Sequence, residues 1–421
     1  MQNNDGSYFE TLKLQTSIHL MDLHSNFPYW LLKNGIVNSY PSLQQNESCD
    51  VAIIGAGISG ALIAWYLGNA GIKTILLDKR HAGTGSTAAS TALLQYEIDV
   101  PLHKLIEKVG EEHAVASYQL CLDAINKMKN ISHKVEQSIS FNNKPSLQYA
   151  SVASHVQNLQ IEYDCRKKYC FPVHWLNEEQ VKSKFGFSKK GAILSDAGGT
   201  IDAYKFTHDI LQYSMLHFGA KVFDKTAVSN IQKNKAGFEL ATANGFKIQS
   251  KNIVIACGYE SQAYLPEKIQ KLYATYAIVS EPLPTGDFWY KNSIIWETAE
   301  PYLYMRTTKD NRILIGGKDI PYTSGKARDK ELKNKVKALE KSFATLFPEI
   351  PFKTDFSWAG TFAGTKDGLP YIGEHKSRPG IYFALGFGGN GITFSSIAGE
   401  IIRDIILQQK NKNKAIFKFG R

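Results

Sequence analysis

The N-terminal part of the chain carries three glycines and a carboxylate whose spacing could hold a nucleotide. Residues 55–60 read GAGISG and fit the pattern G-x-G-x-x-G. Gly55 would permit a tight turn, Gly57 would let a pyrophosphate approach the backbone, and Gly60 would let a helix pack closely on a strand. Asp78 follows at the distance where a carboxylate accepts hydrogen bonds from ribose hydroxyls. These residue types predict a dinucleotide site.

The elements that must position these residues are visible on both sides of the glycines. Residues 51–54 form a short apolar run typical of a buried strand, residues 61–70 form a helix that ends at Gly71, and residues 72–77 form a second buried strand. All of this falls within about 30 residues, which makes the pattern more specific than a glycine-rich turn of some other α/β protein. Asp78 disfavours NADP, but residues 50–80 alone do not separate FAD from NAD.

Size, cysteine content and charge exclude several classes of protein. A chain of 421 residues is too long for one simple core, so two domains are expected. No run of about 18 apolar residues and no signal-peptide pattern is present, so no membrane span is expected. Five cysteines without zinc-site spacing favour a reduced, cytoplasmic setting. The net charge of 49 − 39 = +10 comes from scattered lysines, which favours a solvated basic surface over a nucleic-acid patch.

The rest of the chain also shows helix and strand patterns. Residues 1–48 are interpreted as an arm that lies on the body, and residues 410–418 as a frayed basic tail. Between them the pattern predicts a helical segment at 100–135, a helix at 205–218, a buried strand at 253–256, a strand-rich block at 272–320, a helix at 328–346, a strand at 381–384 and a helix at 392–407. The C-terminal part therefore repeats the order of strand, glycine loop and helix.

Six segments, in the right order, resemble the D-amino-acid oxidase family of flavoproteins, which includes glycine, sarcosine and γ-glutamylputrescine oxidases. They are residues 85–92 (GSTAASTA), 199–220, 253–258 (IVIACG), 304–317, 367–373 (DGLPYIG) and 386–391 (GFGGNG). Residues 27–30 (FPYW) are similar to the γ-glutamylputrescine oxidase branch. The resemblance implies an α/β fold, with a Rossmann-like FAD-binding domain and a second α+β substrate domain built on a mixed or antiparallel sheet.

The same resemblance implies that the chain passes repeatedly between these two domains. The arm and the first FAD-binding part would cover residues 1–95, and a helical first part of the substrate domain residues 96–190. A second FAD-binding part would cover 191–262, and the second substrate part 263–352. The last FAD-binding part and the basic tail would cover 353–421.

FAD is the cofactor that the resemblance implies, shared between the two ends of the chain. The glycines at 386–391 would let backbone approach a flat ring, and the next helix would stabilise the anionic reduced flavin, although close packing also explains such glycines. Residues 358–366 lack the cysteine that holds flavin covalently in sarcosine oxidases, so non-covalent FAD and no metal are expected. The expected FAD-binding residues are Gly55, Gly57, Ile58, Ser59, Gly60, Asp78, Lys79, Gly85, Ser86, Ser90, Thr91, Ala92, Val228, Cys257, Gly258, Gly364, Asp367, Gly388, Gly389, Asn390, Gly391, Ile392 and Thr393.

The implied reaction is hydride transfer from a carbon next to an amine nitrogen to flavin N5, followed by hydrolysis of the imine. The partners would be a small amine or amino acid and O2 or another electron acceptor. Because the flavin carries the difficult step, no catalytic triad is expected, and no dedicated base is needed if the amine binds neutral. Oxidation of a hydroxy acid or other alcohol is an alternative, and a tRNA-associated flavoprotein is a distant one.

Two departures from the family narrow the substrate. The basic residues that hold the substrate carboxylate in sarcosine oxidases match Thr393 and Gln95 here, so a simple sarcosine-like amino acid is disfavoured. Arg306 matches a strand where relatives keep a carboxylate-binding arginine. Glu97 would suit a cationic amine, although a surface or salt-bridged carboxylate is an equally good interpretation. The aromatic candidates for the pocket wall, each also a candidate for plain core, are Tyr96, Tyr302 and Tyr304.

Overall fold

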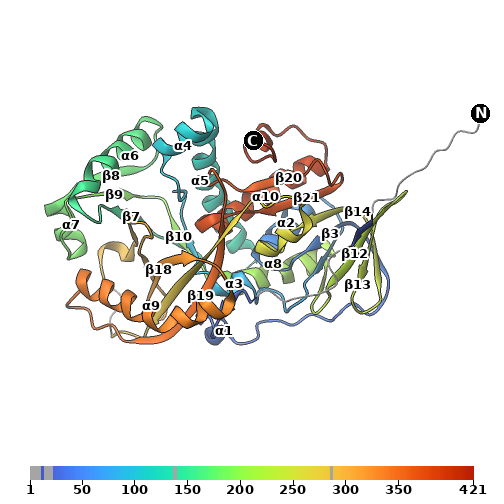
Figure 1. Ribbon diagram of the computed structural model, residues 1–421, viewed down its shortest axis with the longest axis horizontal. Coiled ribbons are helices and arrows are strands. Elements are labelled where there is room, and N and C mark those ends of the chain that lie inside the picture. The colour runs from blue at the N-terminus through green and yellow to red at the C-terminus, as the bar shows by residue number, and fades with distance from the viewer. Residues whose placement is uncertain (1–10, 14–21, 136–139, 285–287) are drawn as a thin grey trace, which may run out of the picture.

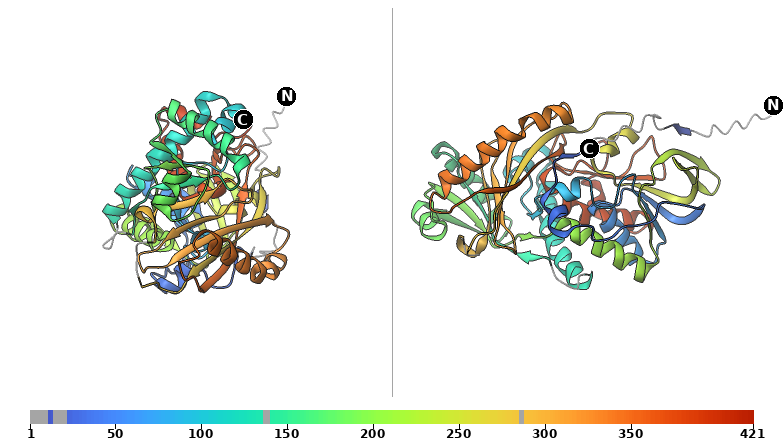
Figure 2. Two further views of the ribbon diagram at one scale, coloured as in Figure 1. Left: turned by 90° about the vertical axis from the view of Figure 1, so that its left-hand side faces the viewer. Right: turned by 90° about the horizontal axis from the view of Figure 1, so that it is seen from below.

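The computed structural model describes residues 11–13, 22–135, 140–284 and 288–421, and the account below is confined to them. Two lobes lie side by side along the long axis, each built around one large sheet (Figures 1 and 2). Residues 1–10 and 14–21 of the expected arm lie outside the described residues. No helix in the described ranges is both long and apolar enough to cross a bilayer.

The first lobe is built on a sheet with a parallel centre. β3 (Glu47–Ile54) pairs in parallel with β4 (Thr74–Leu77) on one side and with β14 (Lys247–Ile255) on the other, and β21 (Ile381–Leu385) pairs in parallel with β14. The strand before the glycine motif and the strand before the C-terminal glycine loop are therefore separated by a single strand. The sheet is completed by β1 (Thr11–Lys13), β11 (Lys221–Phe223), β12 (Val228–Asn234), β13 (Gly237–Thr242) and β20 (Tyr371–Glu374).

Helix α2 (Ile58–Gly68) is the crossover between β3 and β4, and it is apolar on every side. A helix with this pattern has to be buried all round. The structure shows why, because α2 packs between the sheet, α8 (Ala203–Phe218) and α10 (Gly391–Ile406) (Figure 1). Ser59 is the exception in α2, since its side chain is only partly buried and points toward the cavity described below.

The second lobe is built on a mostly antiparallel sheet, and among the described strands of this sheet β7 and β16 form the one parallel pair. Its strands, in sheet order, are β2 (His24–Ser25), β19 (Thr354–Gly364), β15 (Lys271–Ser280), β18 (Ile313–Pro321), β17 (Tyr304–Thr307), β16 (Ile294–Glu297), β7 (Ser146–Tyr149), β9 (Gly191–Ser195) and β8 (Val173–Asn177). Helix α9 (Gly325–Leu346) packs on this sheet through Leu339 and Phe343, which are fully buried. The expected boundaries at 191 and 353 differ from this arrangement, because β9 and β19 belong to the second sheet.

Short elements connect the lobes. A three-stranded sheet joins β5 (Leu93–Leu94), β10 (Gly199–Thr200) and β6 (Asn142–Asn143) directly after the loop at 85–92. The remaining helices are α1 (Tyr29–Asn34), α3 (Ser86–Ala89), α4 (Leu102–Val109), α5 (Glu111–Val135), α6 (Val156–Lys168) and α7 (Glu178–Phe185). The arm contacts the body through α1, where the Trp30 ring nitrogen donates to the carbonyl of Ser90 at 2.7 Å. The arm therefore holds the loop at 85–92 from outside.

The C-terminal segment is ordered, which corrects the expectation of a frayed tail. Phe417 is fully buried, and its carbonyl accepts a hydrogen bond from the amide of Ile372 at 2.8 Å. Phe419 stacks on Tyr371 with the ring centroids 5.1 Å apart. The lysines that suggested a frayed tail precede two aromatic residues, Phe417 and Phe419, which anchor the segment.

Phe417→Ala should lower the free energy of unfolding by about 3–5 kcal/mol, because it leaves a cavity beside Phe394 of α10. Leu407→Ala is the matched control, since Leu407 is 37% exposed and should cost less than about 1 kcal/mol. Urea denaturation of the three proteins measures the difference. Equal stability of Phe417→Ala and wild type would contradict the packing of this segment.

Candidate active site

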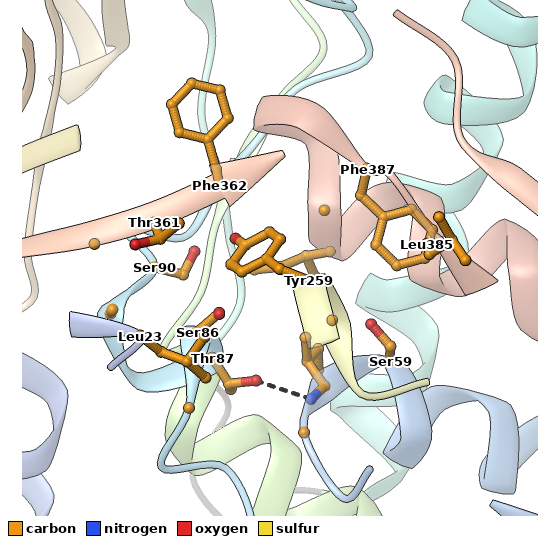
Figure 3. Close-up of a pocket in the computed structure, with 18 of the residues that line it drawn as sticks. Leu23, Ser59, Ser86, Thr87, Ser90, Tyr259, Thr361, Phe362, Leu385 and Phe387 are labelled. Carbon is orange, nitrogen blue, oxygen red and sulfur yellow. Dashed lines mark hydrogen bonds between the residues drawn. The ribbon is translucent and has the colours of Figure 1, made fainter. Parts of the chain in front are cut away.

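A cavity of about 900 Å³ lies where the two lobes meet. It is large enough for a nucleotide cofactor, because ligand cavities range over roughly 300–1,000 Å³. Figure 3 shows Ser86, Thr87 and Ser90 on one side of this space and Ser59, Leu385 and Phe387 on the other. Its lining comes mostly from the segments at 54–59, 77–80, 83–95, 97–99, 226–228, 256–264 and 385–392, together with residues of β15, β16, β17, β18 and β19.

The glycine motif forms one end of the cavity by a tight turn into α2. Gly55 has a φ of +112°, which favours glycine. A Cβ on Gly60 would lie 1.9 Å from the carbonyl oxygen of Gly55, so only glycine lets α2 start this close to β3. The amide of Ile58, in the first turn of α2, donates to the Thr87 hydroxyl at 3.0 Å (Figure 3). The turn after β3 is thereby joined to the loop at 85–92.

Asp78 at the end of β4 organises the backbone beside this turn. Its two carboxylate oxygens accept hydrogen bonds from the amides of Ala56 and Arg80, each at 2.9 Å. Burial raises the pKa of Asp78 above its ordinary value even though both amides favour the charged form. A carboxylate has about four lone-pair positions, so two amides leave acceptor capacity for ribose hydroxyls. The neighbouring Lys79 and Arg80 both pair with Glu260.

The C-terminal glycine loop forms a second side of the cavity. The side-chain amide of Asn390, at the start of α10, donates to the carbonyls of Gln95 and Glu97 at 3.0 and 2.9 Å. Asp99 accepts a hydrogen bond from the amide of Gly389 at 2.8 Å and another from the hydroxyl of Tyr302 at 3.1 Å. These bonds fix the loop against residues 95–99 of the other end of the chain.

These residues fit FAD. The helices α2 and α10 both begin at the cavity, and neither has an acidic residue in its first turn or an N-cap side chain that caps it. Amides at a helix N-terminus bind phosphate, which fits the pyrophosphate at α2. The same partial positive charge at α10 fits the electron-rich edge of a flavin ring.

Three carboxylates and three aromatic rings line another part of the cavity, and we call this group of residues the acidic wall. Its members are Glu97, Asp99, Asp319, Trp296, Tyr302 and Tyr304. The ring centroids of Trp296 and Tyr302 lie 6.1 Å apart, and those of Tyr302 and Tyr304 lie 5.7 Å apart. Burial raises the pKa of Tyr302 well above its ordinary value, and the charges of Asp99 and Asp319 raise it further, so both carboxylates lie near this ring.

The cationic residues that line the cavity lie outside the acidic wall. Within the described ranges they are Lys79, Arg80 and Arg378, which follow strands of the first sheet. None of them belongs to the acidic wall. The two ends of the cavity therefore differ in charge.

Glu97 is held in a buried network with one arginine and a second glutamate. Its Oε1 atom lies 3.7 Å from Nη1 of Arg166, and Nε of Arg166 lies 2.6 Å from Oε1 of Glu162. Burial raises the pKa of Glu97 to about 7, although the charge of Arg166 acts in the opposite direction. Burial likewise raises the pKa of Asp319 to about 6, against the hydroxyl of Thr275.

Most of the residues that the sequence suggested for FAD do line the cavity. They are Gly55, Gly57, Ile58, Ser59, Asp78, Lys79, Gly85, Ser86, Ser90, Thr91, Ala92, Val228, Cys257, Gly258, Gly388, Gly389, Asn390, Gly391 and Ile392. The exceptions among them are Gly60, Gly364, Asp367 and Thr393. Gly60 acts through the packing of α2, and the carboxylate of Asp367 pairs with Arg421 at 2.7 Å.

The substrate candidates divide in the same way. Glu97, Gln95, Tyr302 and Tyr304 line the cavity, whereas Tyr96, Thr393 and Arg306 do not. Tyr96 stacks on Phe171 in the core with a centroid distance of 5.3 Å, and the Thr393 hydroxyl lies 3.4 Å from the carbonyl of Gln95.

Arg306 differs most from its expected role as a substrate contact. Arg306 is 4% exposed, and its guanidinium donates to the carbonyls of Ala92 and Ile201 at 2.8 and 2.9 Å. It also lies 5.4 Å from the ring of Trp30. These contacts use the guanidinium to hold the loop at 85–92. The geometry therefore corrects the expectation that Arg306 binds the carboxylate of a substrate.

Sequence reasoning missed Asp99, Trp296, Phe362 and Asp319, which all line the cavity. Asp99 had a usable signal, because Gln95, Glu97 and Asp99 alternate as side chains do on one side of an extended segment. No pattern in the sequence marked Asp319 as a cavity residue, because its position depends on how β18 pairs with β15 and β17.

Comparisons with known proteins agree with this geometry. A family model described as FAD dependent oxidoreductase (DAO) matches residues 50–405. Glycine oxidase of Geobacillus kaustophilus (strain HTA426) is 25% identical over 374 residues, 85% of this chain and 92% of the relative. Gamma-glutamylputrescine oxidoreductase of Escherichia coli (strain K12) is 23% identical over 387 residues, 87% and 85% respectively. The crystal structure of the Geobacillus glycine oxidase superposes with a TM-score of 0.75 and 22% identity, covering 89% of this chain and 99% of that chain.

Proposed function

We propose that this chain, which belongs to the DAO family of FAD-dependent oxidoreductases, oxidises a C–N bond of an amine or amino acid to an imine that water then hydrolyses. One observation carries the proposal: a single cavity joins the glycine motif at residues 55–60 to the acidic wall. A cofactor held by the motif therefore shares one space with side chains that can hold a substrate nitrogen.

Bound FAD would supply the two-electron acceptor for the carbon–hydrogen bond next to the nitrogen. The residues of the chain bind the cofactor, place the substrate and exclude water. Arg306 and Trp30 hold the loop at 85–92 from behind, and Asp99 holds the loop at 386–391. Trp296, Tyr302 and Tyr304 supply a flat apolar surface on which a carbon chain can pack.

Anaerobic addition of candidate substrates to the yellow protein tests this function. We expect amines or amino acids to bleach the flavin and hydroxy acids to leave it unchanged, with peroxide release separating an oxidase from a dehydrogenase. Acid precipitation should release the colour, because residues 358–366 contain no cysteine to hold FAD covalently. Bleaching by hydroxy acids alone would refute the proposed reaction, and a colourless protein that takes up no FAD would refute the cofactor.

A further inference from the structure

We propose that the substrate is a cationic amine without a carboxylate on the reacting carbon, and that the carboxylate of Glu97 in the acidic wall binds its ammonium group. This inference rests on the proposed function and deepens it by naming the charge of the substrate. Three features of the acidic wall carry it: an unused acceptor atom, a surface of aromatic rings, and a one-sided distribution of charge.

Glu97 offers an acceptor atom that the protein leaves unused. The side chain is 4% exposed and lines the cavity. Its Oε2 atom has no partner at hydrogen-bond distance in the described part of the chain, while the nearby Ser146 hydroxyl favours the charged carboxylate and acts to lower its pKa. Its other oxygen faces Arg166, which is shared with Glu162. Buried acceptors are almost always satisfied, because an unmet acceptor loses its hydrogen bonds to water without replacement. A ligand N–H group at Oε2 would restore the missing bond.

The aromatic part of the acidic wall also favours a cation. Tyr302 lies between the other two rings, within 6.1 Å of Trp296 and 5.7 Å of Tyr304 by centroid. The indole nitrogen of Trp296 donates to the hydroxyl of Ser146 at 3.1 Å, and the amide of Gln95 donates to the same hydroxyl at 3.3 Å. The faces of Trp and Tyr rings attract ammonium groups. Rings that are fixed in this way lose little conformational entropy when a cation binds.

The charges around the acidic wall oppose an anionic substrate. Asp319 adds a second buried carboxylate oxygen, Oδ1, that has no hydrogen-bond partner among the described residues. The cation whose charge lowers the pKa of Asp319 is Lys335 of α9. No lysine or arginine belongs to the acidic wall in the described ranges, although Arg166, which does not line the cavity, lies 3.7 Å from the other carboxylate oxygen of Glu97. Recognition of a carboxylate normally uses a bidentate arginine. An amino acid would therefore bring its carboxylate to like charges, whereas an ammonium group would neutralise one of them.

Glu97 is also placed to take the proton that an ammonium group must lose before oxidation. One N–H bond of R–CH2–NH3+ breaks, its proton forms an O–H bond at Oε2, and the nitrogen lone pair becomes available. The carbon would then lose a hydride, the hydrogen together with its bonding electron pair, to bound FAD. This leaves R–CH=NH2+, which water hydrolyses to an aldehyde and ammonium. The groups facing Glu97 are Arg166 and Glu162 of α6, Tyr118 and Cys121 of α5, Ser146 of β7 and the adjacent Tyr96.

Binding of compounds that cannot be oxidised separates recognition from turnover. tert-Butylamine, tert-butanol and pivalate share the tert-butyl group and carry a positive, zero and negative charge. All three lack the hydrogen that oxidation removes. Titration of the FAD-loaded protein with each, followed by the flavin absorbance, gives three dissociation constants. We expect the amine to bind tightest. Pivalate binding at least as tightly, or no binding of the amine, would overturn the inference.

Glu97→Gln keeps the shape of the side chain and removes its charge. Glu97→Gln should weaken the binding of tert-butylamine by roughly 10- to 100-fold, the usual range for loss of a charge-assisted hydrogen bond. It should leave the dissociation constant of tert-butanol unchanged. Glu178→Gln is the control, because Glu178 is exposed on α7 and pairs only with surface groups in the described structure. Asp319→Asn is a second variant with the same expected direction. An unchanged dissociation constant in Glu97→Gln, or an equal loss in the control, would overturn the inference.

Bleaching of the flavin by matched pairs separates this inference from the proposed function. Butylamine and norvaline differ by one carboxylate, as do benzylamine and phenylglycine. We expect the amine of each pair to be the better reductant, and Glu97→Gln to need a higher pH for reduction by butylamine. Reduction by the amino acids alone would overturn the inference and leave the proposed function intact. Reduction by hydroxy acids alone would overturn the proposed function itself.

Discussion

Arg166→Met is expected to lower the free energy of unfolding by about 3–5 kcal/mol at about pH 8, the usual cost of removing one partner of a buried ion pair. Arg166 is fully buried, and its guanidinium lies 2.6 Å from Glu162 and 3.7 Å from Glu97. It also donates to the side chain of Gln148 at 3.0 Å. Without this cation, two buried carboxylates lose their common counter-charge.

The same network gives the change a pH dependence of known sign. Burial alone would raise the pKa of Glu162, but Arg166, His103 and two backbone amides lower this pKa to about 2. The charged carboxylate of Glu162 therefore stabilises the fold fully above its ordinary pKa, and this stabilisation is lost as the pH falls toward 2. The pKa of Glu97 is raised to about 7 by burial, so its charged form lowers stability as the pH rises from about 4.5 to 7. In Arg166→Met we expect the pKa values of both carboxyls to rise, because burial then acts without the charge of Arg166, and the variant should lose stability steeply with rising pH.

Urea denaturation at about pH 5 and about pH 8 measures this effect. The deficit of Arg166→Met should be smaller at the lower pH, where protonated carboxyls need no counter-charge. Adding Glu162→Gln to the variant should restore part of the loss at about pH 8. Lys190→Met removes an exposed ion pair with Glu178 and should cost less than about 1 kcal/mol. A deficit that is independent of pH would contradict the electrostatic role of Arg166.

Gly60→Ala should prevent the protein from retaining FAD. The added Cβ would lie 1.9 Å from the carbonyl oxygen of Gly55 and 3.0 Å from its carbon, and a backbone contact this close can be relieved only by moving α2 away from β3. The amides at the start of α2 would then leave their positions. Loss of two charge-assisted hydrogen bonds to the pyrophosphate would cost about 3–6 kcal/mol, or at least about 100-fold in FAD affinity.

Titration of the apoprotein with FAD, followed by flavin fluorescence, measures this loss. Gly71→Ala is the control, because Gly71 lies just beyond the other end of α2 and has no atom within 4 Å of the added Cβ. Its φ of +78° should cost about 1 kcal/mol of stability and leave FAD binding unchanged. Tight FAD binding by Gly60→Ala would show that α2 does not need its close approach to β3.

The predicted family, FAD cofactor and two-domain α/β fold are confirmed by the comparisons. These features depended on segments that are continuous in the sequence. The pattern of the strand, glycine turn and helix at residues 51–68 depends on residues that are close together in the sequence. Residue type and spacing were therefore sufficient to predict these elements. The predicted helix ends at 218 and 346 also agree with α8 and α9, and α8 ends at the left-handed Gly219 that marked its end in the sequence.

The roles of single polar residues were not predictable in the same way. Arg306 was expected to hold a substrate carboxylate, yet the register of β17 places its guanidinium against the carbonyls of residues 92 and 201. The lysine-rich segment at 410–418 was expected to fray, yet Phe417 packs on α10 and the following Phe419 packs on β20. In each case the deciding contact comes from a residue far away in the chain, which composition and periodicity do not report.

The glycine motif, the acid at 78 and the C-terminal glycine loop were determined by the sequence itself, since each needs particular residue types at fixed local spacing. The acidic wall was decided by the tertiary structure. Glu97 and Asp99 come from the segment after β5, Trp296 from β16, Tyr304 from β17 and Asp319 from β18. Strand register brings Trp296, Tyr304 and Asp319 to the cavity, because a shift by one residue would turn each of them to the opposite face of the sheet. The path of the chain after β5 brings Glu97 and Asp99 to the same cavity.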